Sequence, residues 1–136
     1  MPRARIGRQQ FAALLEDDGP SPVRAGLLAR KAKSLMVQSR YHLAVRIARE
    51  ALAEQEALPD DCDPAYVDEI GALNALGVSL MATGDVEEGA QALRDALALA
   101  KRTGSGMDRT AAAVNLSDAL HLVGRTEEAL EVARRW

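Results

Sequence analysis

The chain has 136 residues, enough for one domain, and its 17 basic and 20 acidic residues give a formal net charge of −3. Aromatic residues make up only 3% of the chain while apolar residues reach 48%, so the core must be built from Ala, Leu and Val. Ala and Leu favour helices, whereas strands depend on β-branched and aromatic residues. This composition argues against a β-sandwich or barrel and predicts an all-α fold.

Features of secreted or membrane proteins are missing from the sequence. The single cysteine, Cys62, cannot form an internal disulfide or a multi-cysteine zinc site. No apolar run approaches the ~20 residues that cross a bilayer. The basic start at residues 1–5 has no hydrophobic region behind it and is not a secretory signal. We therefore expect a cytoplasmic protein with no membrane partner.

Charge is unevenly distributed along the chain. Residues 1–50 hold ten basic and four acidic residues, and residues 51–136 hold seven basic and sixteen acidic residues. A basic first third could contact phosphates or an acidic partner. Basic residues without interleaved aromatics are a weak nucleic-acid signal, so we interpret them as a solvated helix face and do not expect nucleic-acid binding.

The first elements are predicted from breakers and caps. Residues 1–20 form an N-terminal segment with a short helix over residues 8–17, ended by a Gly/Pro-rich breaker. Residues 21–136 form the helical domain. Ser21 caps and Pro22 opens a helix that ends near residue 38, and a second helix covers residues 41–57.

Four more helices follow in the same way. Asp63 caps a helix over residues 64–83, and Asp85 with Glu88 resembles a capping box that opens a helix ending near residue 102. Ser105 or Asp108 caps the next helix, which ends before Gly124. The last helix begins at residue 125 and is still running at residue 136.

An internal repeat organises these helices. Residues 76–90 align with residues 116–130 without a gap at an offset of 40, so that Gly84 matches Gly124 and the two Glu-Glu pairs coincide. A weaker copy carries Leu35 and, after the turn at residues 39–41, regularly spaced alanines. A unit of helix, turn and helix cannot bury its apolar face alone and must stack on further copies.

The repeat resembles the tetratricopeptide repeat family. The matching features are the Leu-Gly pair at residues 76–77, the Gly-Asp turn at residues 84–85, and small residues along each second helix, namely Ala44, Gly89 and Ala129, then Ala51 and Ala96. Lys31, Ser117 and Trp136 depart from the pattern. The resemblance implies a right-handed α-solenoid of about three helical hairpins with a short N-terminal helix. The copies cover about residues 22–57, 64–103 and 106–136, the last ending inside its second helix as in a truncated repeat.

A second resemblance concerns the kind of parent protein. The period of 40 exceeds the usual ~34 of the family. Residues 115–130 are similar to the helical region of large LuxR-type actinobacterial transcriptional regulators. This similarity implies the repeat part of a regulatory protein, although neither a phosphate-binding loop nor a DNA-binding domain fits in the chain.

The family resemblance also implies a site. In tetratricopeptide repeats the first helix of each hairpin lines an inner groove, so we expect a non-catalytic module that binds another protein or a peptide. Methionines make such a surface adaptable. The implied lining is Lys33, Met36, Val37, Asn74, Val78, Met81, Val114, Asp118 and His121. The polar members would fix the partner's orientation.

Two alternatives stay open for the surfaces of this module. The groove could be covered by the N-terminal helix or by another element of a longer protein. The last helix could instead form a homodimer, with apolar residues paired across a symmetry axis. The residues for such self-association are Leu130, Val132, Ala133 and Trp136.

Catalytic and metal-binding residues form no convincing constellation. His42 and His121 lie in different copies, and Asp118 one turn before His121 is more often a solvent-facing hydrogen-bond partner than a proton relay. The acidic loop at residues 60–63 lacks the glycine and the downstream glutamate of a calcium loop, and its carboxylates make Cys62 less reactive. We expect no enzyme activity, no metal and no cofactor.

Overall fold

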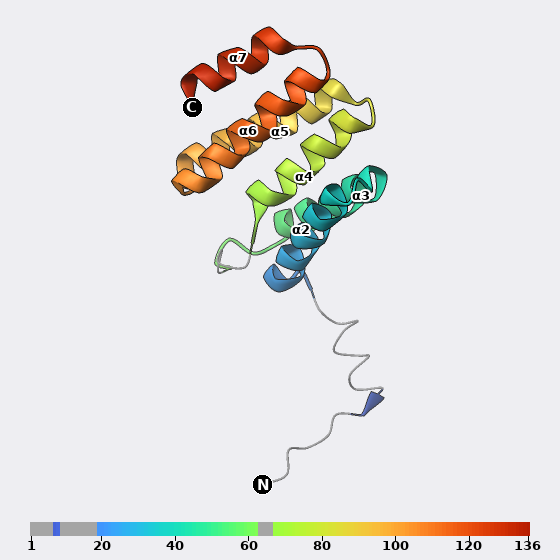
Figure 1. The fold of residues 1–136 in the computed structure, drawn as a ribbon. Helices are drawn as coiled ribbons and strands as arrows, with labels where there is room; N and C mark the ends of the chain where they lie inside the picture. The colour runs from blue at the N-terminus through green and yellow to red at the C-terminus, as the bar shows by residue number, and fades with distance from the viewer. Residues whose placement is uncertain (1–6, 9–18, 63–66) are drawn as a thin grey trace.

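A computed structural model describes residues 7–8, 19–62 and 67–136, in which all regular structure is helical (Figure 1). The helices are α2 (Pro22–Val37), α3 (Tyr41–Glu56), α4 (Glu69–Ala82), α5 (Val86–Thr103), α6 (Gly106–Leu122) and α7 (Thr126–Arg135). They form three consecutive hairpins that stack side by side as an all-α solenoid (Figure 1). The predicted cap Asp63 and Pro64 lie outside the described residues. So does the short helix predicted over residues 8–17, apart from Arg8.

Side-chain caps define the starts of the first helices of the hairpins. The Ser21 hydroxyl accepts a hydrogen bond from the Arg24 N–H, and Ser105 with Asp108 forms a reciprocal capping box at α6. The predicted cap of α2 and the predicted Ser105 cap are confirmed. The start of α4 differs from the prediction, because the Asp68 carboxylate accepts from the Gly71 N–H and the helix begins at Glu69.

The three hairpin turns share one backbone geometry. Ser39, Gly84 and Gly124 all have positive φ, at 60°, 100° and 84°. In each turn the N–H of the next residue donates to the carbonyl five residues before it, which closes the helix as in a Schellman motif. These bonds are Arg40 to Leu35 (2.8 Å), Asp85 to Leu80 (2.9 Å) and Arg125 to Leu120 (2.8 Å). The repeat found in the sequence therefore corresponds to a turn with the same backbone hydrogen bond in each of the three hairpins.

The second helices of neighbouring hairpins are joined by an ion pair that also repeats. Arg49 of α3 pairs with Glu88 of α5 at 2.8 Å, and Arg94 of α5 pairs with Glu128 of α7 at the same distance. The predicted capping box at Asp85 is wrong, since Asp85 makes no side-chain cap and Glu88 pairs with Arg49. Each pair is partly exposed and contributes at most about 1 kcal/mol, and the two pairs join equivalent positions of neighbouring hairpins.

Besides a small cluster of Ala29, Ala51 and Ala72, the core consists of two large clusters of mostly Ala and Leu. One lies among α2, α3, α4 and α5, and the other among α4, α5, α6 and α7. The helix α4 belongs to both clusters, with Leu80 in the first and Met81 in the second. It contacts α2, α3, α5 and α6, so it is the central element of the solenoid.

The hairpin of α4 and α5 is held at a very short separation. A Cβ placed on Gly77 would lie 2.9 Å from the Gly89 carbonyl oxygen, and one on Gly89 would lie 2.8 Å from that of Gly77. Real side chains do not fit at these distances. The expected role of the small residues at these positions is confirmed, because the two backbones are in contact.

We expect Gly89→Ala to lower the free energy of unfolding by about 1–3 kcal/mol, because the added methyl overpacks the α4–α5 contact. Urea denaturation would measure this. Gly106→Ala is the matched control, since a Cβ there meets only the Arg109 guanidinium, at 3.7 Å, and alanine favours helix. Equal effects of the two variants would contradict the close contact.

We expect Ser39→Gly to raise the free energy of unfolding by about 0.5–1 kcal/mol, because Ser39 is a residue with a Cβ held at positive φ. Gly84→Ser should lower it by about 1 kcal/mol through backbone strain alone, since a Cβ at Gly84 meets nothing within 4 Å. A destabilised Ser39→Gly protein would show that the serine hydroxyl outweighs the strain.

Candidate functional site

The first helices of the hairpins, α2, α4 and α6, lie next to one another and form one face of the solenoid (Figure 1). The sequence predicts that this face is the binding surface. Its predicted residues divide among three separate hollows, the core and the solvent-exposed surface.

One hollow lies between α4 and α6. It measures about 390 Å³, and we call it the α4–α6 hollow. Three helices contribute to it: Tyr41 from the start of α3, Val78, Met81 and Ala82 from α4, and Asn115, Asp118, Ala119, Leu122 and Val123 from α6. Three predicted residues, Val78, Met81 and Asp118, therefore share one hollow.

The walls and the rim of the α4–α6 hollow differ in polarity. Met81 and Ala119 are buried and belong to the core cluster, while Leu122 is 83% exposed at the edge. Asp118 is exposed and contributes the only charged side chain of the lining. The lining combines apolar side chains with one carboxylate and the polar groups of Tyr41 and Asn115, which suits an amphipathic ligand group.

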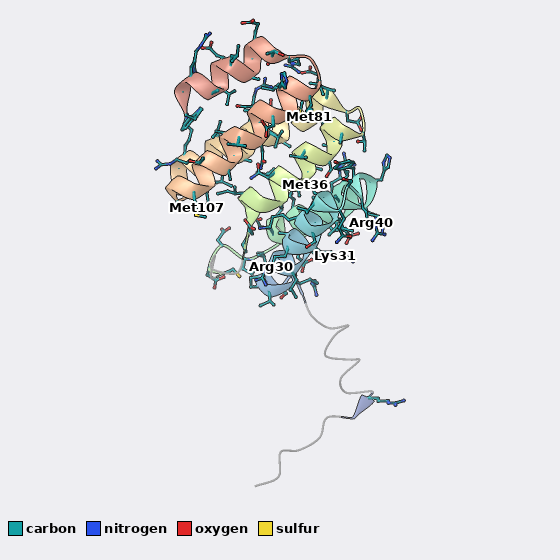
Figure 2. The ribbon with its side chains drawn as sticks, in the orientation of Figure 1. Arg30, Lys31, Met36, Arg40, Met81 and Met107 are labelled. Atoms are coloured by element: carbon teal, nitrogen blue, oxygen red, sulfur yellow. The ribbon has the colours of Figure 1, made fainter. Side chains whose placement is uncertain are left out.

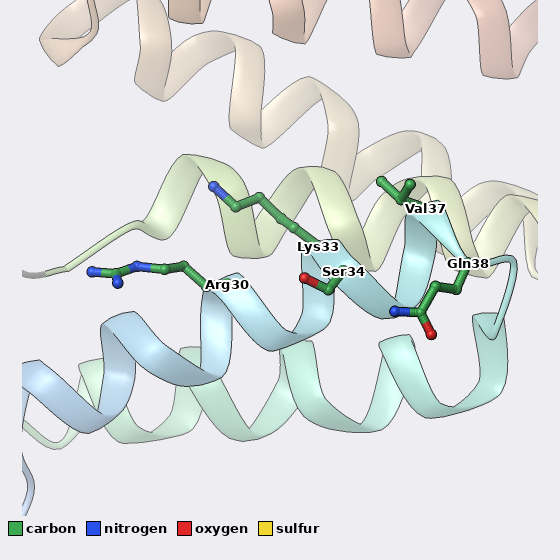
Figure 3. Close-up of a pocket in the computed structure, with 5 residues that line it drawn as sticks. All are labelled: Arg30, Lys33, Ser34, Val37 and Gln38. Carbon is green, nitrogen blue, oxygen red and sulfur yellow. The ribbon is translucent and has the colours of Figure 1, made fainter.

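A second hollow lies on α2 alone. It measures about 470 Å³ and is lined by Arg30, Lys33, Ser34, Val37 and Gln38, so two predicted residues, Lys33 and Val37, meet here (Figure 3). Although it is larger than the α4–α6 hollow, a surface supplied by one helix offers a ligand fewer walls. The Lys33 ammonium is already engaged, because it lies 2.7 Å from a carboxylate oxygen of Asp68.

A third, smaller hollow of about 200 Å³ lies between α6 and α7, and we call it the α6–α7 hollow. It contains the predicted groove residue Val114 and the predicted self-association residues Ala133 and Trp136. Asp118 borders this hollow too, so its carboxylate lies on the ridge between two hollows.

The remaining predicted residues lie apart from the hollows. Met36 is half-buried against the core cluster of α2–α5 (Figure 2). Asn74 is 8% exposed, and its side-chain oxygen has no hydrogen-bond partner among the described residues. His121 is exposed, with Nδ1 3.2 Å from the Thr126 hydroxyl oxygen across the α6–α7 turn.

Sequence reasoning missed Tyr41, Asn115 and Leu122. The spacing of Asn115, Asp118 and Leu122 is that of one helical stripe, so this signal was available once Asp118 had been placed. Tyr41 carried no such signal, because its contribution depends on how the first hairpin sits against α4.

Of the four residues predicted for self-association, Leu130, Ala133 and Trp136 are exposed and Val132 is partly buried. Val132 packs against the core cluster of α4–α7, and the Trp136 ring lies 4.2 Å from the Lys101 ammonium in a cation–π contact. Leu130 is 45% exposed, but it lies two residues from Val132 and so on the other side of α7.

The electrostatics of the face are strongest at Asp68. Burial by itself raises the pKa of this carboxyl group. Hydrogen bonds from the Lys33 ammonium and the Gly71 N–H, together with the charges of Lys33 and Arg30, nevertheless hold the pKa below its ordinary value. The charges of Lys33 and Asp68 are therefore neutralised within the fold.

The residues that the structure describes carry neither a metal-binding nor a membrane-spanning signature. They include no group of three or more His, Cys, Asp or Glu side chains arranged to hold a metal ion. None of the described helices is long and apolar enough to span a bilayer.

The comparison with known families identifies the repeat. A family model described as tetratricopeptide repeat matches residues 68–135, half of the chain, and covers the hairpins α4–α5 and α6–α7. The chain belongs to the tetratricopeptide repeat family. Such repeats generally mediate contacts between proteins and are not themselves catalytic. No curated protein and no solved structure gives a significant match.

We expect stability to depend on the charge of Asp68. Its folded pKa lies below the unfolded value of about 3.9, so the carboxylate stabilises the fold above that pH and the contribution is lost as pH falls through the folded pKa. Asp68→Asn keeps an N-cap of equal quality and removes the charge. It should lower the free energy of unfolding near neutral pH and have little effect near pH 2. Parallel pH profiles of the two proteins would contradict this.

Proposed function

We propose that this tetratricopeptide repeat module binds a segment of a partner protein on the face formed by α2, α4 and α6. The α4–α6 hollow carries the proposal, because three helices place apolar walls beside one orienting carboxylate. Apolar side chains of the partner bury against Val78, Met81 and Leu122, and burial of one large side chain contributes about 1.5–3 kcal/mol.

Charged side chains orient the partner in this proposal. Lys33, Asn74, Asp118 and His121 are the predicted orienting residues. Asp118 borders the α4–α6 hollow without a partner among the described residues and supports that role directly, whereas Lys33 borders the hollow on α2 but is paired with Asp68. Asn74 is enclosed, and His121 contacts Thr126, so we assign both a supporting role next to the groove.

We further infer that the module serves in a regulatory protein of the cytoplasm. This inference rests on the similarity of residues 115–130 to LuxR-type transcriptional regulators. In such a protein the repeats present the groove to a partner whose binding changes the activity of another part.

Self-association through α7 is the alternative function. The exposure of Leu130 and Trp136, at 45% and 42%, supports it. The cation–π contact between Lys101 and Trp136 weakens it, since an ammonium already covers one face of the ring. Light scattering after size exclusion, across a concentration series, separates a monomer from a dimer.

The groove proposal is tested by selecting peptides from a random displayed library against the whole chain. We expect Leu122→Gln to weaken binding of the selected peptides at least about fivefold, because it removes a large apolar side chain at the edge of the hollow. Leu130→Gln is the matched control on α7 and should leave binding unchanged.

The opposite result would favour the alternative. If Leu130→Gln dissociates a dimer and Leu122→Gln changes nothing, α7 is the functional surface. If no peptide is selected, the groove proposal fails.

A further inference from the structure

The α4–α6 hollow has an unbalanced charge. Asp118 is the one carboxylic acid in its lining, and no lining residue is basic. Within the part of the chain that the structure describes, its carboxylate has neither an ion-pair nor a hydrogen-bond partner. A carboxylate beside an apolar surface is stabilised by the charge of a cation bound next to it.

The basic side chains that the structure describes lie outside the lining of this hollow. Arg30, Lys31 and Arg40 belong to the first hairpin and are not part of the lining, although Arg40 directly precedes the lining residue Tyr41 (Figure 2). Arg94 and Arg125 are paired with Glu128. No cation of the described chain neutralises Asp118, in contrast to Asp68, which holds Lys33.

Helix dipoles reinforce this charge. Ala82 and Leu122 are the last residues of α4 and α6, so two helix C-termini border the hollow. A helix C-terminus carries about −0.5 of an elementary charge and favours a nearby cation. The start of α3 at Tyr41 has the opposite sign, but one N-terminus is outweighed by two C-termini and a full carboxylate.

The apolar walls match the stem of a basic side chain. Lys and Arg bury their methylene groups along apolar surface while the charged head stays near water. Val78, Met81 and Leu122 supply that surface, and Asp118 lies at the exposed rim. The volume of about 390 Å³ greatly exceeds the ~30 Å³ of one water molecule, so a long side chain has room.

We propose that the α4–α6 hollow receives an arginine or lysine side chain of the partner segment, with its stem on Val78, Met81 and Leu122 and its cation paired with Asp118. This inference rests on the proposed groove function and names the chemistry of the ligand. An acidic side chain is excluded from the hollow by repulsion from Asp118 and from the two helix ends.

The test uses the same displayed peptide library on the whole chain. Peptides selected by the wild-type protein should carry an arginine or lysine next to apolar residues. Each selected peptide is then synthesised twice, once unchanged and once with the basic residue replaced by citrulline for arginine or norleucine for lysine. Fluorescence polarisation should show at least about fivefold weaker binding of the neutral peptide to wild type.

Variants assign the effect to the hollow. Asp118→Asn should weaken the basic peptide at least about fivefold and leave the neutral peptide unchanged, so that the two bind almost equally. Glu127→Gln is the matched control, because it removes one exposed acidic charge on α7 and should have no such effect. Leu122→Gln should weaken both peptides, which separates this hollow from the α6–α7 hollow on the other side of Asp118.

Each contrary outcome has a distinct meaning. Selected peptides without basic residues, or equal binding of basic and neutral peptides to wild type, would overturn the basic-ligand inference while leaving the groove function intact. A basic peptide weakened by Asp118→Asn but not by Leu122→Gln would place the cation outside the α4–α6 hollow and also overturn it. A failure to select any peptide would overturn both proposals.

Discussion

The rest of the structure depends on the backbone contact between Gly77 and Gly89. Because neither residue has a Cβ, α4 and α5 approach until a carbonyl oxygen of one lies against the other glycine. This brings α4 deep enough to join both core clusters and to touch α2, α3, α5 and α6. Because α4 contacts helices of all three hairpins and close-packed interiors deform little, the position of α4 determines where α2 and α6 lie on the binding face.

Stacking of the hairpins has a different origin from the closure of each one. Closure comes from the repeated turn, in which a residue with positive φ lets the next N–H reach the carbonyl five residues back. Stacking comes from small-residue packing, with Ala32, Ala44 and Ala48 fully buried in the first cluster. The exposed Arg49–Glu88 and Arg94–Glu128 pairs link the second helices of neighbouring hairpins but contribute little to the free energy of unfolding.

The sequence predicted the helices, the turns and the repeat, because these depend on local chemistry. Pro22 and Ser21 mark a helix start by themselves, and Gly84 and Gly124 mark turns. The capping box predicted at Asp85 does not form because of a long-range interaction. It requires the Glu88 carboxylate, which instead accepts a hydrogen bond from Arg49, thirty-nine residues away in the sequence. The site was predicted less well, since periodicity assigned residues to a helix face without showing how neighbouring helices divide that face into hollows.

Asp118 and Lys33 show why the division matters. Both were predicted as orienting charges on one groove, and both border a hollow. Lys33 is held at 2.7 Å by Asp68, so a ligand carboxylate must compete with an ion pair already formed. Asp118 has no internal competitor, and a cationic ligand meets an unneutralised acid beside apolar walls. The same spacing in the sequence thus yields a charge used within the fold in one hairpin and a charge available to a partner in another.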